Sequence, residues 1–187
     1  NLFAERWNAK VKRKIRDSRV YGTEHVVSAI EAARNRPQVL VQGSAIGYYG
    51  PRGDESLDES ASPGSDFLAS VCREWEEASE PVEALGVRRA IVRTGIVLAH
   101  GEGALKMMTP IFKLGPGAPV GGDGGLGEAT GRQWMSWVHI DDIVGLFQFA
   151  ADNTAASGPI NGTAPHPVRN AEFSRELSRT LRKPYTP

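Results

Sequence analysis

Residues 39–50 read Val-Leu-Val-Gln-Gly-Ser-Ala-Ile-Gly-Tyr-Tyr-Gly, and this stretch decides the fold. Its first three residues form a short apolar run with two β-branched side chains, which is typical of a parallel strand buried on both faces. Gly43, Ser44 and Ala45 follow at once, and such small residues allow a ligand to lie against the backbone. The stretch therefore predicts a buried strand with a functional segment at its end.

A helix precedes this strand and a long loop follows it. Residues 9–33 carry apolar side chains near helical spacing, which predicts a helix interrupted near Gly22 and ended by Pro37. Residues 44–65 contain glycines, prolines and acidic residues without any period, which indicates a long surface loop. Loops of this length are usually functional in compact domains.

The alternation of helix and strand continues to the end of the chain. Ser65 or Asp66 is expected to cap the next helix, which runs to about Gly86. The later elements expected are a strand at 90–92, a helix at 103–114 interrupted at Pro110, a strand at 134–138, a helix at 141–152, and a helix at 170–181 capped by Asn170. This order predicts a doubly wound α/β sheet, whose ligands bind at the carboxyl ends of the strands.

Composition limits the class of partner. The 187 residues include 22 basic and 22 acidic side chains, so a net charge of zero gives no support to binding of nucleic acid or a membrane surface. The apolar runs are far shorter than the roughly 20 residues that a bilayer span needs. The single cysteine, Cys72, cannot form an internal disulfide, which is compatible with the reducing cytoplasm. We expect a cytoplasmic protein with one domain.

Four segments, in this order along the chain, resemble a known family. They are Asp17-Ser18-Arg19 with Gly22-Thr23, Gly43-Ser44-Ala45-Ile46-Gly47-Tyr48-Tyr49-Gly50, Arg93-Thr94-Gly95-Ile96-Val97-Leu98, and Gln133-Trp134-Met135-Ser136-Trp137-Val138-His139-Ile140-Asp141-Asp142. Together they resemble the extended short-chain dehydrogenase/reductases, the group of nucleotide-sugar epimerases and dehydratases. The combination is similar to the branch named "epimerase family protein", also described as sugar-nucleotide epimerase or cell-division-inhibitor-like.

This resemblance implies a fold, a cofactor and an arrangement of segments. Residues 1–187 are expected to form a single Rossmann-type NAD(P)-binding domain whose first βαβ segment, with its glycine-rich phosphate turn, is missing. The expected cofactor is NADP rather than NAD. Residues 103–137 and 159–187 are expected to contribute a small cap on the substrate side.

The resemblance also implies roles for individual residues. Ser44 is expected to orient a carbonyl or alcohol, and Tyr48 or Tyr49 to handle the proton. The expected cofactor contacts are Asn1, Gly43, Ser44, Ala45, Arg93, Thr94, Gly95, Ile96 and Val97. The expected substrate contacts are Met108, Arg132, Gln133 and Trp134.

The chain departs from the family at the helix that normally carries a Tyr-x-x-x-Lys pair. Residues 66–73 read Asp-Phe-Leu-Ala-Ser-Val-Cys-Arg and contain neither residue. Two interpretations therefore stay open: an NADP-dependent oxidoreductase or epimerase-like enzyme, and a non-catalytic dinucleotide-binding regulatory protein. A small carbonyl, alcohol or nucleotide-sugar is the expected partner of the enzyme, and a homodimer is left open.

No metal site is expected from the sequence. His139-Ile140-Asp141-Asp142 contains metal-ligating residue types. Aspartates at a helix start, however, accept hydrogen bonds from free backbone amides and lie at the positive end of the helix dipole. We interpret this segment as the start of a helix.

Overall fold

The computed structural model describes residues 8–115, 117–119 and 131–186. The chain divides into two compact units. The first unit comprises Asn1–Arg93 and Leu146–Asn161, and the second comprises Thr94–Gly145 and Gly162–Pro187. The proposed cap of residues 103–137 and 159–187 falls in the second unit except for residues 159–161, and it stays a prediction.

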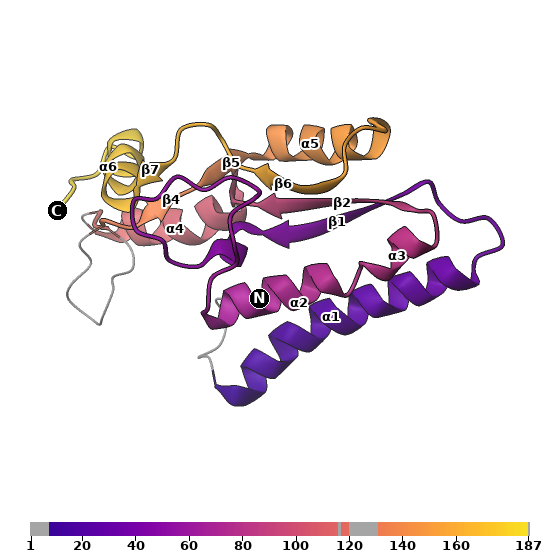
Figure 1. The fold of residues 1–187 in the computed structure, drawn as a ribbon. Coiled ribbons are helices and arrows are strands. Elements are labelled where there is room, and N and C mark those ends of the chain that lie inside the picture. The colour runs from indigo at the N-terminus through magenta and orange to yellow at the C-terminus, as the bar shows by residue number, and fades with distance from the viewer. Residues whose placement is uncertain (1–7, 116, 120–130, 187) are drawn as a thin grey trace. The chain divides into compact units, whose positions relative to one another are not determined.

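A three-stranded sheet forms the centre of the first unit. Its order is β1 (Val39–Ala45), β2 (Arg88–Thr94) and β6 (Gly158–Gly162). Alternate residues of β1 face opposite sides, as the two-residue period of a strand requires. Ser44 contacts α2 (Phe67–Glu77) through Glu76, whereas Gly43 faces Phe147 in the C-terminal part of α5 (Ile140–Asp152). Helices therefore cover the sheet on both faces, as expected for a doubly wound fold (Figure 1).

The helix before β1 is continuous, so the expected interruption is wrong. Helix α1 (Ala9–Ala32) passes through Gly22, and the Asn8 side chain caps it by accepting from the Val11 amide at 3.0 Å. A glycine inside a helix costs only about 1 kcal/mol relative to alanine. The buried side of α1, which includes Val27 and Ile30, offsets that cost by packing into the core.

The next helix starts where the sequence predicts and ends earlier. Asp66 caps α2 by accepting from the Ala69 amide at 2.8 Å, which confirms one of the two expected caps. The helix ends at Glu77, and a separate turn, α3 (Pro81–Ala84), follows. Pro81 begins this turn because proline lacks the amide hydrogen that a continuing helix needs.

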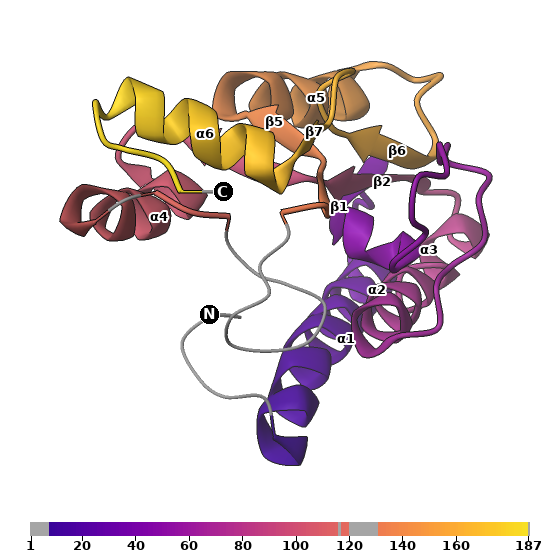
Figure 2. The same cartoon turned by 90° about the vertical axis from the view of Figure 1, so that its left-hand side faces the viewer.

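Helices α1 and α2 lie side by side against one face of the sheet (Figures 1 and 2). Trp75 donates its indole hydrogen to Thr23 Oγ1 at 2.9 Å, and Arg16 pairs with Glu74 at 2.5 Å. Apolar side chains of α1 and α3 pack together in a cluster near β1 and β2. It consists of Val27, Ile30, Val82 and Val87, with Leu40 and Leu85 packed against it.

Strand β1 extends further than the sequence indicates. The expected loop from residue 44 begins only after Ala45 and the short helical turn η1 (Ile46–Tyr49). Residues 51–66 then contain no helix or strand, which confirms most of the predicted loop.

The second unit contains two short strand pairs. Strand β3 (Ile96–Ala99) lies parallel to β5 (Trp137–His139), and β4 (Trp134–Met135) lies antiparallel to β7 (Val168–Arg169). The single strand expected at 134–138 is therefore two strands. The division falls at Ser136, whose carbonyl accepts from the Ile96 amide at 2.8 Å.

Two helices of the second unit correct the sequence prediction. Helix α4 (Gly103–Leu114) continues through Pro110, and Phe112 in its last turn is fully buried, so packing holds the turn in place. Helix α6 (Asn170–Thr180) contacts α4 (Figure 2). Its cap residue is Arg169 and not the expected Asn170, which is the first helical residue. The buried side-chain amide of Asn170 donates to Met135 Sδ at 3.2 Å.

Among the described residues, no helix is long and apolar enough to cross a membrane.

The continuity of α1 leads to a stability prediction. A β-carbon at Gly22 would meet no atom within 4 Å, so Gly22→Ala should raise the free energy of unfolding by about 0.5–1 kcal/mol in urea denaturation. Gly86→Ala is the control, since Gly86 has φ +77° and alanine is strained there. A destabilised Gly22→Ala protein would contradict a continuous helix.

Candidate functional site

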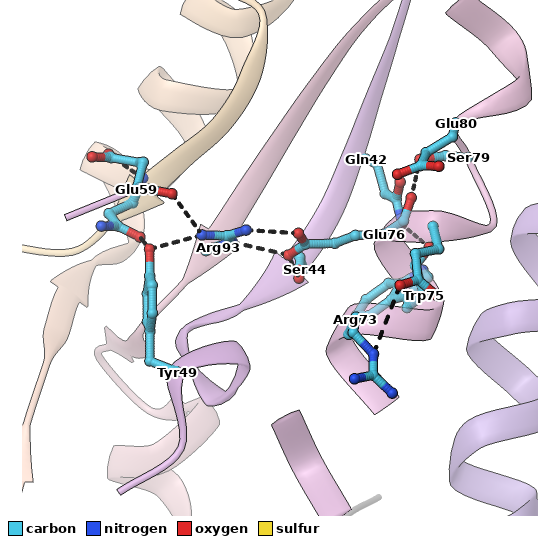
Figure 3. A network of polar contacts seen from close by, with 12 residues as sticks. Gln42, Ser44, Tyr49, Glu59, Arg73, Trp75, Glu76, Ser79, Glu80 and Arg93 are labelled. Carbon is cyan, nitrogen blue, oxygen red and sulfur yellow. Dashed lines mark hydrogen bonds and ion pairs between the residues drawn. The ribbon is translucent and has the colours of Figure 1, made fainter. Parts of the chain in front are cut away.

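Five polar side chains meet at one end of the first unit's sheet (Figure 3). We call them the strand-end network. Each comes from a different element: Ser44 from β1, Tyr49 from η1, Glu76 from α2, Arg93 from β2 and Asn161 from β6.

A buried ion pair lies at the centre of this network. Arg93 donates from Nε to Glu76 Oε1 at 3.0 Å and from Nη2 to Glu76 Oε2 at 2.9 Å, so the contact is bidentate. The two side chains are only 4% and 9% exposed. Burial by itself lowers the pKa of Arg93, but the hydrogen bonds and negative charge of Glu76 outweigh it and raise the pKa above its ordinary value. The guanidinium is therefore a permanent positive charge.

The same guanidinium contacts both tyrosines of the Tyr48-Tyr49 pair. Its Nη1 donates to the Tyr49 hydroxyl at 2.9 Å, and that hydroxyl donates to Asn161 Oδ1 at 2.7 Å. Its carbon Cζ lies 3.5 Å from the ring centroid of Tyr48, which is a cation–π contact. Tyr49 is 4% exposed, whereas Tyr48 is only partly buried.

Ser44 is held inside the network. Its hydroxyl is buried and donates to Glu76 Oε1 at 2.6 Å (Figure 3). A hydroxyl has one hydrogen to donate, and this one is engaged with the carboxylate. The catalytic role predicted for Ser44 stays a prediction, and the structure adds that the side chain is bonded to Glu76.

The loop after η1 is fastened to the network. Asn161 donates its backbone amide to Glu59 Oε1 at 2.8 Å, and Arg93 Nη1 donates to the Glu59 carbonyl at 3.3 Å. The Gly64 amide donates to the Tyr48 carbonyl at 2.9 Å. The end of the loop and the tyrosine turn therefore hold each other in position.

The predicted cofactor contacts have different environments. Asn1 lies outside the described residues. Gly43 leaves room beside β1, since among the described residues only Phe147 Cζ, at 3.9 Å, lies within 4 Å of the place of a β-carbon. The side chain of Arg93 is committed to Glu76 and Tyr49.

The remaining cofactor contacts, residues 94–97, lie in the second unit. The Gly95 amide donates to the Gly162 carbonyl at 3.0 Å, and the Ile96 amide donates to the Ser136 carbonyl at 2.8 Å. These two amides are thus engaged within the second unit. Contact of residues 94–97 with a cofactor stays a prediction.

The predicted substrate contacts also lie in the second unit. Trp134 is 44% exposed, and the Arg169 guanidinium lies 3.8 Å from its ring centroid. The neighbouring Arg132 is exposed, and its carbonyl accepts from Arg169 at 2.5 Å. Met108 and Gln133 are partly buried.

Within residues 8–115, 117–119 and 131–186, no group of three or more metal-ligating side chains is placed to hold a metal ion.

Sequence reasoning missed Glu76, Asn161 and Glu59. For Glu76 a signal existed, because it lies one helical turn after Cys72 on the buried side of α2. Asn161 and Glu59 had no such signal, since each acquires its partner only when distant segments come together. Their importance depends on tertiary structure alone.

Comparison with known proteins shows what the chain is similar to. No protein-family model matches the chain. It is 42% identical over 184 residues to the "Epimerase family protein SDR39U1 homolog, chloroplastic" of Arabidopsis thaliana, covering 97% of this chain and 50% of that protein. It is 40% identical over 184 residues to "Epimerase family protein Mb2239" of Mycobacterium bovis, covering 98% and 58%. The chain is a relative of the epimerase family proteins.

Solved structures of similar proteins show the fold. The human epimerase family protein SDR39U1 (isoform 2), solved with NADPH, matches with a TM-score of 0.82 and 28% identity over 96% of this chain and 58% of that chain. A nucleoside-diphosphate sugar epimerase from Corynebacterium glutamicum matches with a TM-score of 0.78 and 35% identity, covering 98% of this chain and 39% of that chain. The predicted Rossmann-like α/β fold and the family resemblance are confirmed. The chain spans about half the length of the curated relatives that it matches.

The buried ion pair leads to a prediction on stability. Glu76→Gln removes the negative charge and leaves Arg93 buried without a counter-ion, so the free energy of unfolding should fall by about 3–5 kcal/mol. Glu77→Gln is the matched control, because Glu77 is exposed and contacts Arg73 only at 3.7 Å. Equal effects of the two substitutions in urea denaturation would contradict the importance of the pair.

Cys72 provides a second prediction. Burial, assisted by the charge of Glu76, raises the pKa of its thiol to about 11. The thiolate is the reactive form, so the folded protein should not react at this residue with a thiol reagent at pH 8. Reaction should appear only with denaturant. Rapid labelling of Cys72 without denaturant would show that α2 is not packed as described.

Proposed function

We propose that the protein containing this chain binds a nicotinamide dinucleotide, NADP(H) in preference to NAD(H), and acts as an epimerase-like oxidoreductase. The observation that carries the proposal is the likeness, at a TM-score of 0.82 over 96% of the chain, to a human relative solved with NADPH. The expected substrate class is a small carbonyl, an alcohol or a nucleotide sugar.

The carboxyl end of β1 is where we place the nicotinamide ring. Gly43 and Ala45 project from the same face of the strand, and the place of a Gly43 side chain is vacant but for Phe147 Cζ at 3.9 Å. Ligands of doubly wound sheets bind outside the carboxyl ends of the strands, and small residues there let a ligand approach the backbone. The backbone of Gly43, Ser44 and Ala45 would hold the ring, and the bound dinucleotide would supply hydride transfer.

The residues expected to contact a substrate all belong to the second unit. The exposed ring of Trp134 has the positively charged guanidinium of Arg169 against its face. Arg132, two positions earlier in the sequence, is also exposed. These residues, with Met108 and Gln133, would give a partly apolar wall with a few polar groups, as small-molecule sites usually have. The cytoplasmic location expected from the sequence stays a prediction.

A regulatory protein that binds the dinucleotide without catalysis is the second candidate. The specific observation that favours it is that residues 66–73 of the helix contain neither tyrosine nor lysine. Turnover of bound NADPH in a screen of carbonyl compounds and nucleotide sugars separates the candidates. Oxidation of NADPH supports the enzyme, and binding without any turnover supports the regulator.

Binding of the dinucleotide is itself a prediction. Isothermal titration of the protein at its natural length should show NADPH binding about tenfold or more tightly than NADH, a difference of about 1.4 kcal/mol in free energy. Absence of heat with both dinucleotides, on folded protein, would refute the proposal. Equal affinities would refute only the preference for NADP(H).

A further inference from the structure

We propose that Tyr48 is the residue that transfers a proton to or from the substrate oxygen, and that Arg93 and Glu76 position it. The inference rests on the proposed function, because proton transfer matters only if the protein is an oxidoreductase.

Hydrogen bonding separates the three candidate hydroxyls. Ser44 is buried and its hydrogen is donated to Glu76 Oε1 at 2.6 Å. Tyr49 is buried, its hydrogen is donated to Asn161 at 2.7 Å, and its oxygen accepts from Arg93 at 2.9 Å. Neither hydroxyl can give its hydrogen to a substrate while these bonds persist.

Tyr48 differs from both. It is only partly buried, and among the described residues its hydroxyl has no hydrogen-bond partner. Its position is nevertheless fixed at two points. Its ring lies against the Arg93 guanidinium, with Cζ 3.5 Å from the centroid, and its carbonyl accepts from the Gly64 amide at 2.9 Å. A fixed ring with an available hydroxyl suits a general acid and base.

The guanidinium assists through its charge and leaves the Tyr48 hydroxyl unoccupied. In carbonyl reduction the Tyr48 O–H bond would break and an O–H bond to the substrate oxygen would form, with the hydride for the carbonyl carbon supplied by NADPH as reductant. Water then returns a proton to Tyr48. Negative charge that develops on the ring is stabilised by a cation against its face, and this charge is permanent because the pKa of Arg93 is raised.

Glu76 acts through Arg93 and not on the substrate. Its two carboxylate oxygens accept from Nε and Nη2, which fixes the plane of the guanidinium, and Ser44 fixes one of those oxygens in turn. A planar group held by two parallel bonds cannot rotate away from the ring. Glu76 and Ser44 are therefore positioning residues.

Nitration of tyrosines by tetranitromethane tests the exposure and role of Tyr48 without turnover. On the protein at its natural length, mapped by mass spectrometry, Tyr48 should be nitrated and Tyr49 should not. NADPH at about ten times its Kd should slow nitration of Tyr48 about tenfold, since the hydroxyl is then covered in most molecules. Tyr21, which is 49% exposed on α1, serves as the internal control and should be unaffected. Nitration of Tyr49 in place of Tyr48, or no protection of Tyr48 at saturating NADPH, overturns the inference.

The role of the guanidinium has its own readout. In the double variant Glu76→Leu with Arg93→Met, both charges are replaced by apolar side chains, a change that packed cores often tolerate. If the charge assists Tyr48, its nitration relative to Tyr21 should become slower. If Arg93 only held the fold together, nitration of Tyr48 relative to Tyr21 would stay the same, or would become faster because the Tyr48 ring is less tightly held. Either result overturns the role of Arg93.

Kinetics complete the test and separate it from the proposed function. With phenanthrenequinone as the carbonyl probe, Tyr48→Phe should lower kcat by about 10²–10⁴ while the Kd for NADPH stays the same. Tyr49→Phe, the matched control, should mainly lower the free energy of unfolding. Wild-type activity that survives in Tyr48→Phe overturns the inference alone. A wild-type protein that binds NADPH but never oxidises it refutes the enzyme proposal and this inference together.

Discussion

The contact between Glu76 and Arg93 is the interaction on which the strand-end network depends. Both side chains are almost wholly buried, and each charge is tolerable there only because the other is present. The pair also connects α2 with β2, and through Ser44 and Tyr49 it reaches β1 and η1. Three segments distant in sequence, the β1–η1 segment, α2 and β2, are thus joined at this end of the first unit by one bidentate contact and its hydrogen-bonded neighbours.

This contact explains why the motif from Gly43 to Gly50 indicates where a ligand binds but not which of its side chains faces that ligand. The stretch from Gly43 to Gly50 identifies the place where a ligand is expected, because small residues follow a buried strand there. It does not identify the side chain that faces the ligand. The side chains differ in their contacts. The hydroxyls of Ser44 and Tyr49 donate their hydrogens to Glu76 and Asn161, whereas the ring of Tyr48 lies against the Arg93 guanidinium.

Local signals in the sequence predicted much of the fold. The Asp66 cap and the strand at 39–41 depend on neighbouring residues, and both are present in the structure. The continuity of α1 at Gly22 and of α4 at Pro110 could not be predicted in this way, because distant packing outweighs a local preference. Among the site residues, the network partners Glu76 and Asn161 were missed because the contacts that define them span 17 to 112 positions.

A double-mutant cycle on Glu76 and Arg93 tests the central claim most directly. Glu76→Leu and Arg93→Met are made singly and together, and the free energy of unfolding is measured in urea for all four proteins. Each single substitution leaves one buried charge without a partner, whereas the double substitution leaves none. The account predicts that the double variant is more stable than either single variant, with a coupling free energy of about 3 kcal/mol or more. If the two single effects simply add, the pair is not the interaction that holds the network together.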